Sequence, residues 1–332
     1  MGSDAWMNRR SFIAAVSTGL ISSPLVSRAQ RPAGVRRIGW LFDDAAGAED
    51  EISKAYPDHL RTFGWIEGKN LIVERRYTGG RTDRLKALSE ELVGLKVELI
   101  VAEGTLAGLA VKSTTSTLPI VVARSADPVL TGLVASLASP GTNVTGTSTM
   151  APDLYRKRVQ LLRDLLPAAR RIGLLLTVNP IHRLERNAYE QAHREHGMQP
   201  IFIEVSQPEQ VEPAVDELAR QGAQALRVGP DPFLFANFQS ILKASRRHSL
   251  PLIVEERSLL EAGGLMSYGP DDADLNRQVA SIIDKILGGT KPADIPVRQP
   301  TKFELLINLK TARAFGITVP PALLQRADGL IQ

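Results

Sequence analysis

The fold class follows from residues 171–177, whose sequence is Arg-Ile-Gly-Leu-Leu-Leu-Thr. A strand inside a parallel sheet is covered by helices on both faces and is continuously apolar, whereas a strand with one wet face alternates apolar and polar residues. Residues 172–176 show the continuous pattern. They predict a buried parallel strand and, with it, an α/β fold.

Strand-like and helix-like segments alternate on both sides of this strand, in two similar series. We expect two doubly wound α/β lobes rather than one large barrel, because each series has the length of one domain. The first series predicts strands at 35–42, 70–77, 97–101, 119–123 and 143–147, with helices at 82–94 and 105–113. The second predicts strands at 171–177, 200–205, 223–228 and 252–254, with helices at 154–166, 208–221 and 232–248.

The C-terminal region adds units that have no partner in this tandem order. Residues 263–269 predict a strand, residues 271–287 a helix, and residues 303–315 a final βα unit. We therefore expect the chain to cross between the lobes, forming a hinge of several segments with a ligand cleft between the lobes. The predicted parts are a signal peptide at 1–29, a first lobe of 30–148 plus 265–297, and a second lobe of 149–264 plus 298–332.

The N-terminus predicts export. Arg9 and Arg10 precede an apolar run at 12–26 that is too short to span a bilayer, and small residues end at Ala29, just before Gln30. This pattern is typical of a signal peptide of the twin-arginine type, cleaved near Ala29, although the general secretory route stays open. A disordered arm is the alternative, but it does not explain the apolar run. We expect the mature protein in a bacterial periplasm.

The composition argues against several classes of protein. The chain has no cysteine, which excludes disulfides and a lipid anchor on an N-terminal cysteine. No later stretch reaches the ~18 apolar residues of a membrane span, and the net charge of +4 is scattered rather than gathered on one face as in nucleic-acid-binding proteins. Motifs for ATP hydrolysis, a serine nucleophile or a metal site are absent. We expect a monomer that is no enzyme and needs no cofactor or metal.

Seven short segments in one order carry a resemblance to a known family. They are GWIEGKNL at 64–71, LPIV at 118–121, DPV at 127–129, PGTNVTG at 140–146, GGLMSYG at 263–269, KPADIPV at 291–297 and KFEL at 302–305. Over about residues 36–331 the chain resembles the ABC-transporter substrate-binding proteins that include tryptophan- and aromatic-amino-acid-binding members. The resemblance implies the type I periplasmic binding fold, with three crossings between the lobes. It also implies delivery of a small molecule to a membrane permease driven by a cytoplasmic ATPase.

In open parallel sheets a ligand binds beyond the carboxyl ends of the strands, so the strand ends of the first series predict contact residues. Phe42 offers a ring for stacking and Asp43 a carboxylate for an ammonium or hydroxyl, although a core ring and a solvated acid fit equally. Thr105 and Leu106 open a helix whose N-terminal N–H groups favour a carboxylate, with Thr105 as a cap only as the alternative. Arg124 and Ser125, at the end of the fourth strand, are expected to face the cleft.

The second series predicts contacts from the other side of the cleft. Asn179 and Asp231 follow strands, and Asp231 also suits a helix cap. Phe233 either stacks on a planar ligand or packs beneath its helix. Glu255 suits a cationic or polyhydroxyl ligand, with a salt-bridged turn as the alternative, and Tyr268 precedes an expected hinge crossing.

These features predict the periplasmic substrate-binding component of an ABC importer, which captures its ligand by hinge closure. The alternatives are a ligand-sensing domain for a receptor and a hydrolase built on paired carboxylates such as Asp43 and Glu255. Residues 104–107, Gly-Thr-Leu-Ala, depart from the Thr-Pro-Ala-Ala-like turn of the aromatic-amino-acid-binding members. The expected ligand is therefore an amino acid or a small aromatic or carboxylated metabolite.

Overall fold

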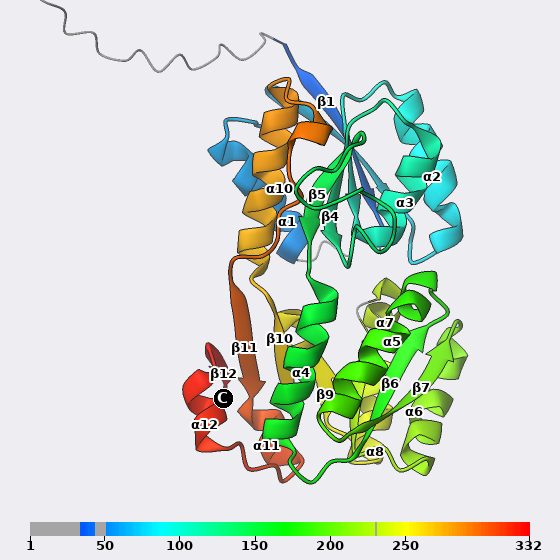
Figure 1. Ribbon diagram of the computed structural model, residues 1–332, viewed down its shortest axis with the longest axis vertical. Coiled ribbons are helices and arrows are strands. Elements are labelled where there is room, and N and C mark those ends of the chain that lie inside the picture. Colours follow the sequence, from blue (N-terminus) through cyan, green and yellow to red (C-terminus); the bar gives the residue numbers. More distant parts are fainter. Residues whose placement is uncertain (1–33, 44–50, 230) are drawn as a thin grey trace, which may run out of the picture. The chain divides into compact units, whose positions relative to one another are not determined.

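The computed structural model describes residues 34–43, 51–229 and 231–332 of the chain (Figure 1). The described residues from Val35 onward fold into two α/β lobes, each built on one sheet. The predicted signal peptide at 1–29 and its cleavage site near Ala29 lie outside the described residues.

The first lobe contains a parallel five-stranded sheet with the order β2-β1-β3-β4-β5. Helices α1 and α10 cover one face over Ile38, Trp40 and Phe42, and helices α2 and α3 cover the other face over Leu41. The strands are β1 (Arg36–Phe42), β2 (Leu71–Tyr77), β3 (Ile100–Glu103), β4 (Ile120–Ser125) and β5 (Val144–Ser148). The helices are α1 (Glu51–Thr62), η1 (Thr82–Arg84), α2 (Leu85–Gly94), α3 (Gly104–Thr114), α10 (Asp272–Leu287) and η3 (Pro292–Asp294).

The second lobe contains a seven-stranded sheet with the order β12-β11-β10-β9-β8-β6-β7. All of its paired strands are parallel except β10 and β11, which run antiparallel. The strands are β6 (Arg171–Thr177), β7 (Gln199–Val205), β8 (Ala225–Val228), β9 (Leu252–Val254), β10 (Met266–Pro270), β11 (Phe303–Asn308) and β12 (Gly329–Ile331). The helices are α4 (Ala151–Leu165), α5 (Pro180–Glu195), η2 (Pro208–Gln210), α6 (Val211–Arg220), α7 (Pro232–Ala236), α8 (Phe238–Arg247), α9 (Arg257–Glu261), α11 (Leu309–Ala314) and α12 (Pro321–Arg326).

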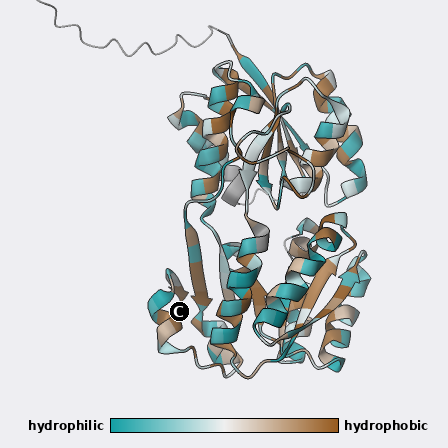
Figure 2. Cartoon of the chain, viewed as in Figure 1, coloured by the Kyte–Doolittle hydropathy of each residue, from teal (hydrophilic) through white to brown (hydrophobic). Residues whose placement is uncertain are grey.

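Strand β6 confirms the interpretation of its apolar sequence. Leu174 and Leu176 pack into the core on one face of the sheet, and Leu175 packs into the core on the other. All three are at most 3% exposed. Figure 2 shows the same apolar character along the central strands and mixed hydropathy on the helices. The two doubly wound lobes predicted from the sequence are confirmed.

Three local features differ from the predictions. The sheet of the second lobe is not wholly parallel, because β11 pairs antiparallel with β10. The helix predicted at 232–248 is broken at Asn237 into α7 and α8. Strand β12, which pairs with β11, was not predicted from the sequence.

The chain passes between the two sheets at three places. It does so between β5 and α4, between β10 and α10, and between η3 and β11. Residues 265–270, assigned to the first lobe from the sequence, differ from that assignment because β10 pairs with β9 and β11 of the second sheet. The first and third passages are hydrogen-bonded to each other, since Ser148 N–H donates to the Arg298 carbonyl at 2.8 Å. The first and third passages therefore form a small paired structure rather than separate linkers.

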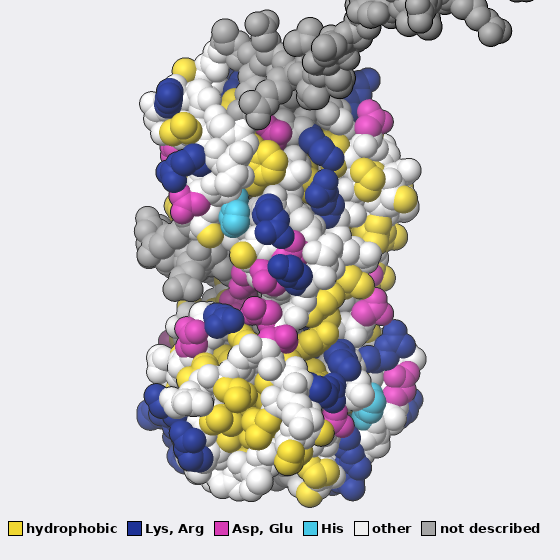
Figure 3. All heavy atoms as spheres, turned by 90° about the vertical axis from the view of Figure 1, so that its left-hand side faces the viewer, with side chains coloured by type: hydrophobic (Ala, Val, Ile, Leu, Met, Phe, Trp, Pro, Cys, Tyr) yellow, Lys and Arg dark blue, Asp and Glu magenta, His cyan; other side chains and the backbone are white. Residues whose placement is uncertain are grey.

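The surface carries charges of both signs. Figure 3 shows basic and acidic side chains interspersed on one face, with acidic side chains gathered near its mid-height. Such a mixture differs from the one-sided basic face of nucleic-acid-binding proteins. Among the described residues, no helix has both the length and the apolar character required to cross a bilayer.

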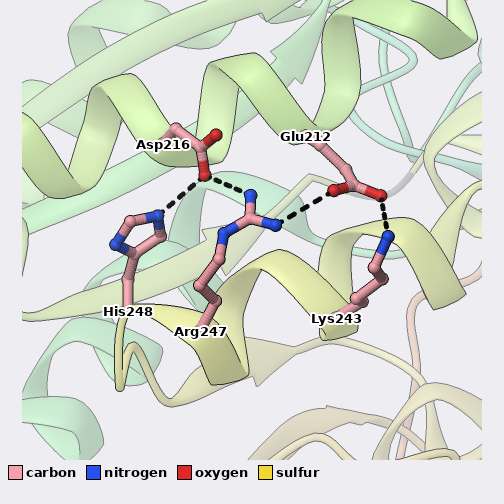
Figure 4. A network of polar contacts seen from close by, with 5 residues as sticks. All are labelled: Glu212, Asp216, Lys243, Arg247 and His248. Carbon is pink, nitrogen blue, oxygen red and sulfur yellow. Dashed lines mark hydrogen bonds and ion pairs between the residues drawn. The ribbon is translucent and has the colours of Figure 1, made fainter.

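A network of polar contacts joins α6 to α8 on the surface of the second lobe (Figure 4). Lys243 donates to Glu212 at 3.0 Å, and Arg247 contacts both Glu212 and Asp216. His248 Nε2 lies 2.7 Å from Asp216 Oδ1. The hydrogen bond from Arg247 holds the pKa of Asp216 below its usual range. The network thus links α6 to α8 on the solvent-facing side of the two helices.

We expect Arg247→Ala to lower the melting temperature only slightly, because exposed ion pairs contribute little to stability and are screened by salt. The loss should shrink further as sodium chloride is raised. Thermal unfolding at low and high salt checks this. A large loss that does not depend on salt would show that Arg247 stabilises the helix pair by packing rather than by charge.

Candidate ligand-binding site

A cavity of about 280 Å³ is lined by residues from both lobes. The first lobe contributes the carboxyl ends of β1, β3 and β4 and the starts of α3 and α10. The second lobe contributes α4, the starts of α5 and α7, and residues that follow β9. This is where doubly wound sheets bind ligands, and the volume lies near the lower end of the ~300–1,000 Å³ typical of small-molecule sites.

The N-terminus of α3 lies at the cavity wall. Glu103, Gly104, Thr105 and Leu106 line the cavity, and Gly104 begins the helix with a φ of +78°, a backbone conformation that favours glycine. The N-cap residue Glu103 makes no side-chain cap hydrogen bond. The first N–H groups of a helix have no acceptor within the helix, so this end offers donors to an anionic group such as a carboxylate.

Thr105 is not the N-cap that the sequence allowed it to be. It lies one residue inside α3, and its Oγ1 accepts a hydrogen bond from the Ala126 N–H at 3.1 Å. The side chain is 8% exposed and lines the cavity. Thr105 therefore holds the loop after β4 against α3. The first turn of α3, which contains Thr105, lines the cavity.

Arg124 lines the cavity from a strained part of β4. Its φ is +59°, uncommon for a residue with a side chain, and its N–H donates to Thr147 Oγ1 at 2.9 Å. The guanidinium donates to Asp272 at 2.7 Å and to Asn276 at 3.0 Å, both in the first turns of α10. Arg124 thereby joins the cavity wall to α10, the helix that follows the second passage between the lobes.

Two buried arginines and a glutamate form an ion cluster at the second-lobe wall, and Arg158 and Glu255 of this cluster line the cavity. Glu255 accepts contacts from Arg158, at 2.8 Å, and from Arg227. The two arginine side chains are 3% and 4% exposed, respectively. The Arg227 guanidinium also lies 4.7 Å from the ring centre of Tyr155 and 4.5 Å from that of Tyr189, in cation–π geometry. Both oxygens of Glu255 are thus engaged by arginines, as in the salt-bridged alternative.

Glu185 and His182 line the cavity from consecutive turns of α5. Glu185 Oε2 accepts a hydrogen bond from the Tyr155 hydroxyl at 2.6 Å, and the residue is 3% exposed. Burial raises the pKa of Glu185 to about 7 and lowers the pKa of His182. Burial therefore favours the uncharged form of both side chains.

Arg124 and seven of the ten other residues predicted from the sequence line the cavity, and the structure brings them together from both lobes. Asp43 accepts a hydrogen bond from the Thr78 hydroxyl at 3.0 Å. Asn179 and Asp231 cap α5 and α7, respectively, as well as lining the cavity. The seven are Phe42, Asp43, Thr105, Leu106, Asn179, Asp231 and Glu255.

The other three lie elsewhere, for local reasons. Ser125 follows the strained Arg124, where the β4–β5 register shifts, so that Arg124 and not Ser125 lines the cavity. Phe233 packs against the core of the second lobe, as its packing alternative allowed. Tyr268 stacks on Phe303 with ring centres 6.0 Å apart, while its strand neighbours on both sides line the cavity, as alternation in a strand requires.

Sequence reasoning missed Arg158 and Glu185, because it searched strand ends and these residues lie inside helices. One signal was available for Glu185. Ile181, Glu185 and Tyr189 recur at four-residue spacing and are all buried, so the glutamate lies within an apolar helix face. A charged residue in such a stripe marks a candidate for function.

The family described as ABC transporter substrate binding protein matches residues 46–331, which is most of the chain. The chain belongs to this family. The ABC transporter context of the sequence analysis is thereby confirmed, and the family consists of substrate-binding transport proteins rather than enzymes.

This substrate-binding protein is similar to a curated protein and to solved structures. It is 24% identical over 269 residues to the Tyrosine-binding protein of Clostridioides difficile strain R20291, covering 81% of this chain and 77% of the relative. The ABC domain from Streptococcus pneumoniae in complex with L-Trp has a TM-score of 0.84 and 26% identity, covering 90% of this chain and 100% of the other. A conserved domain protein from Vibrio cholerae has a TM-score of 0.84 and 25% identity, covering 89% and 99%. These likenesses confirm the type I periplasmic binding fold.

Proposed function

We propose that this substrate-binding protein captures an amino acid or a related small carboxylated metabolite in the cavity between its lobes, and delivers it to a membrane permease and its ATPase. The observation that carries the proposal is the N-terminus of α3 at the wall of a cavity lined from both lobes. Family membership and the L-Trp complex of a structural relative support it. The proposal places the protein in the periplasm as a monomer after cleavage near Ala29.

Hinge closure is the proposed mechanism of capture. A ligand that contacts both lobes binds the closed form better than the open form and shifts the population toward closure. We propose the seven cavity-lining residues named above as contacts, with Thr105 and Leu106 at the carboxylate. The hydrolase alternative loses support, because Glu255 is held by two arginines and is a poor nucleophile or base.

The first test is a thermal-shift screen of residues 30–332 with L-tryptophan, L-tyrosine, other amino acids, aromatic acids and sugars. A ligand that binds only the native state stabilises it by ~2.7 kcal/mol at a hundred times its Kd. We expect a saturable shift with at least one amino acid. Tyramine, which is tyrosine without its carboxylate, should bind at least tenfold more weakly than L-tyrosine.

Two outcomes would overturn the proposal. One is the absence of any shift across the screen with a folded protein. The other is chemical conversion of a bound compound, detected by mass spectrometry. Such conversion would favour the enzyme alternative.

A further inference from the structure

We infer that Glu185 contacts the ligand and accepts a hydrogen bond from a hydroxyl or ammonium group that lies away from the ligand's carboxylate. The cavity would then select ligands with such a donor over equally large ligands without one. The inference rests on the proposed function and specifies the ligand chemistry of the same cavity.

The two oxygens of Glu185 differ in their partners. Oε2 accepts the Tyr155 hydroxyl at 2.6 Å, whereas Oε1 is buried and has no hydrogen-bond partner in the part of the chain that the structure describes. Leaving a buried acceptor unpaired costs about 1–3 kcal/mol, and more when it is charged. Because Glu185 lines the cavity, a donor on a bound ligand is the partner that removes this cost.

Among the described residues, no arginine or lysine forms an ion pair with Glu185 that would supply the missing partner of Oε1. Arg158 and Arg227 are both paired with Glu255. The titratable and charged groups that act on Glu185 are Tyr155 of α4, Tyr189 of α5, Arg227 of β8, Glu255 after β9 and Asp127 after β4. Arg158 and His182 line the same cavity.

The protonation of Glu185 gives the inference a second readout. Burial raises its pKa to about 7, so part of the empty protein carries a proton on Glu185 at neutral pH. A ligand donor stabilises the carboxylate form, lowers this pKa and releases the proton. Affinity should therefore rise with pH up to about 7 and level off above it, with about a tenfold loss for each pH unit below.

The test uses two matched pairs of probes that separate the two donor types. L-tyrosine and L-phenylalanine differ only in a hydroxyl, and L-lysine and L-norleucine differ only in an ammonium. Isothermal titration calorimetry is run on the wild type, on Glu185→Gln and on Glu190→Gln. Glu190 is the matched control, because it lies on the same helix, does not line the cavity and pairs with Arg186 at 3.2 Å.

We expect the wild type to bind the donor-bearing member of one pair at least tenfold more tightly. Glu185→Gln should lose this preference and the pH dependence, whereas Glu190→Gln should keep both. If Glu185→Gln fails to fold, titration of the wild type at pH 7 in phosphate and in Tris decides instead, since the difference in heat between the two buffers reports the protons released on binding.

Several results would overturn the inference. They are equal binding within both pairs, an unchanged preference in Glu185→Gln, no proton release, or failure of the wild type to bind either donor-bearing probe while it binds another compound. If the wild type binds no compound in the screen at all, the proposed function fails, and the inference fails with it.

Discussion

Gly146→Ala is expected to prevent the first lobe from folding stably. Gly146 lies in β5 beside β4, with a φ of +153°, and a Cβ at this position would lie 1.9 Å from the Val122 carbonyl oxygen. Because that atom belongs to the backbone of β4, relief requires the two strands to separate. The Gly146 carbonyl also accepts the Arg298 N–H at 2.9 Å, which ties β5 to the third passage between the lobes. We expect a loss above about 4 kcal/mol, a large part of a typical domain's stability.

Tryptophan fluorescence during urea unfolding reports on this change, because Trp40 and Trp65, the tryptophans of residues 30–332, both pack in the first lobe. Gly39→Ala in β1 of the same lobe is the matched control. The nearest atoms to its Cβ would be side-chain atoms of Leu92 and Ile100, at 3.2–3.4 Å, so a loss of about 1–3 kcal/mol is expected. Equal unfolding midpoints for the two variants would contradict the argument.

Glu255→Gln is the second change with a large expected effect. It leaves Arg158 and Arg227 buried without a counter-charge, and removing one partner of a buried ion pair costs about 3–5 kcal/mol. The second lobe should unfold at lower urea. Far-ultraviolet circular dichroism should therefore show an early transition that tryptophan fluorescence from the first lobe does not share.

The control for Glu255→Gln is Glu304→Gln. Glu304 pairs with Arg257 at 3.1 Å, and the two side chains are 35% and 49% exposed. An exposed pair of this kind contributes at most about 1 kcal/mol. If Glu255→Gln and Glu304→Gln shift the urea unfolding of the second lobe equally, the buried arginines do not depend on Glu255 for their charge balance.

The sequence predicts the architecture well where burial leaves a pattern. The apolar strands and the spacing of helices indicate both sheets, as residues 172–176 illustrate. The direction of β11 leaves no such pattern, because a strand's sequence does not record which way its neighbour runs. The predicted lobe boundary near residue 265 was wrong for the same reason. The strands that pair with β10 decide the sheet to which it belongs, and its own sequence does not record them.

The candidate site is predictable only where one rule applies. Strand ends identify Phe42, Thr105 and Asp231, because parallel strands finish at one edge. At the end of β4 they identify Arg124 but fail at Ser125, because the positive φ of Arg124 turns the Ser125 side chain away from the cavity. That backbone geometry depends on neighbours far along the chain. Strand ends also miss Glu185, which reaches the cavity from within a helix.

Helix α10 has a consequence for how the molecule is made. It follows a strand of the second sheet yet completes the core of the first lobe, where Trp65 Nε1 donates to Asp284 Oδ1 at 2.9 Å across 219 residues. During synthesis, α1 alone covers this face of the first sheet until α10 has left the ribosome, near the end of elongation. Neither lobe can then be completed in N-to-C order, and the nascent chain exposes part of an apolar sheet for most of its elongation.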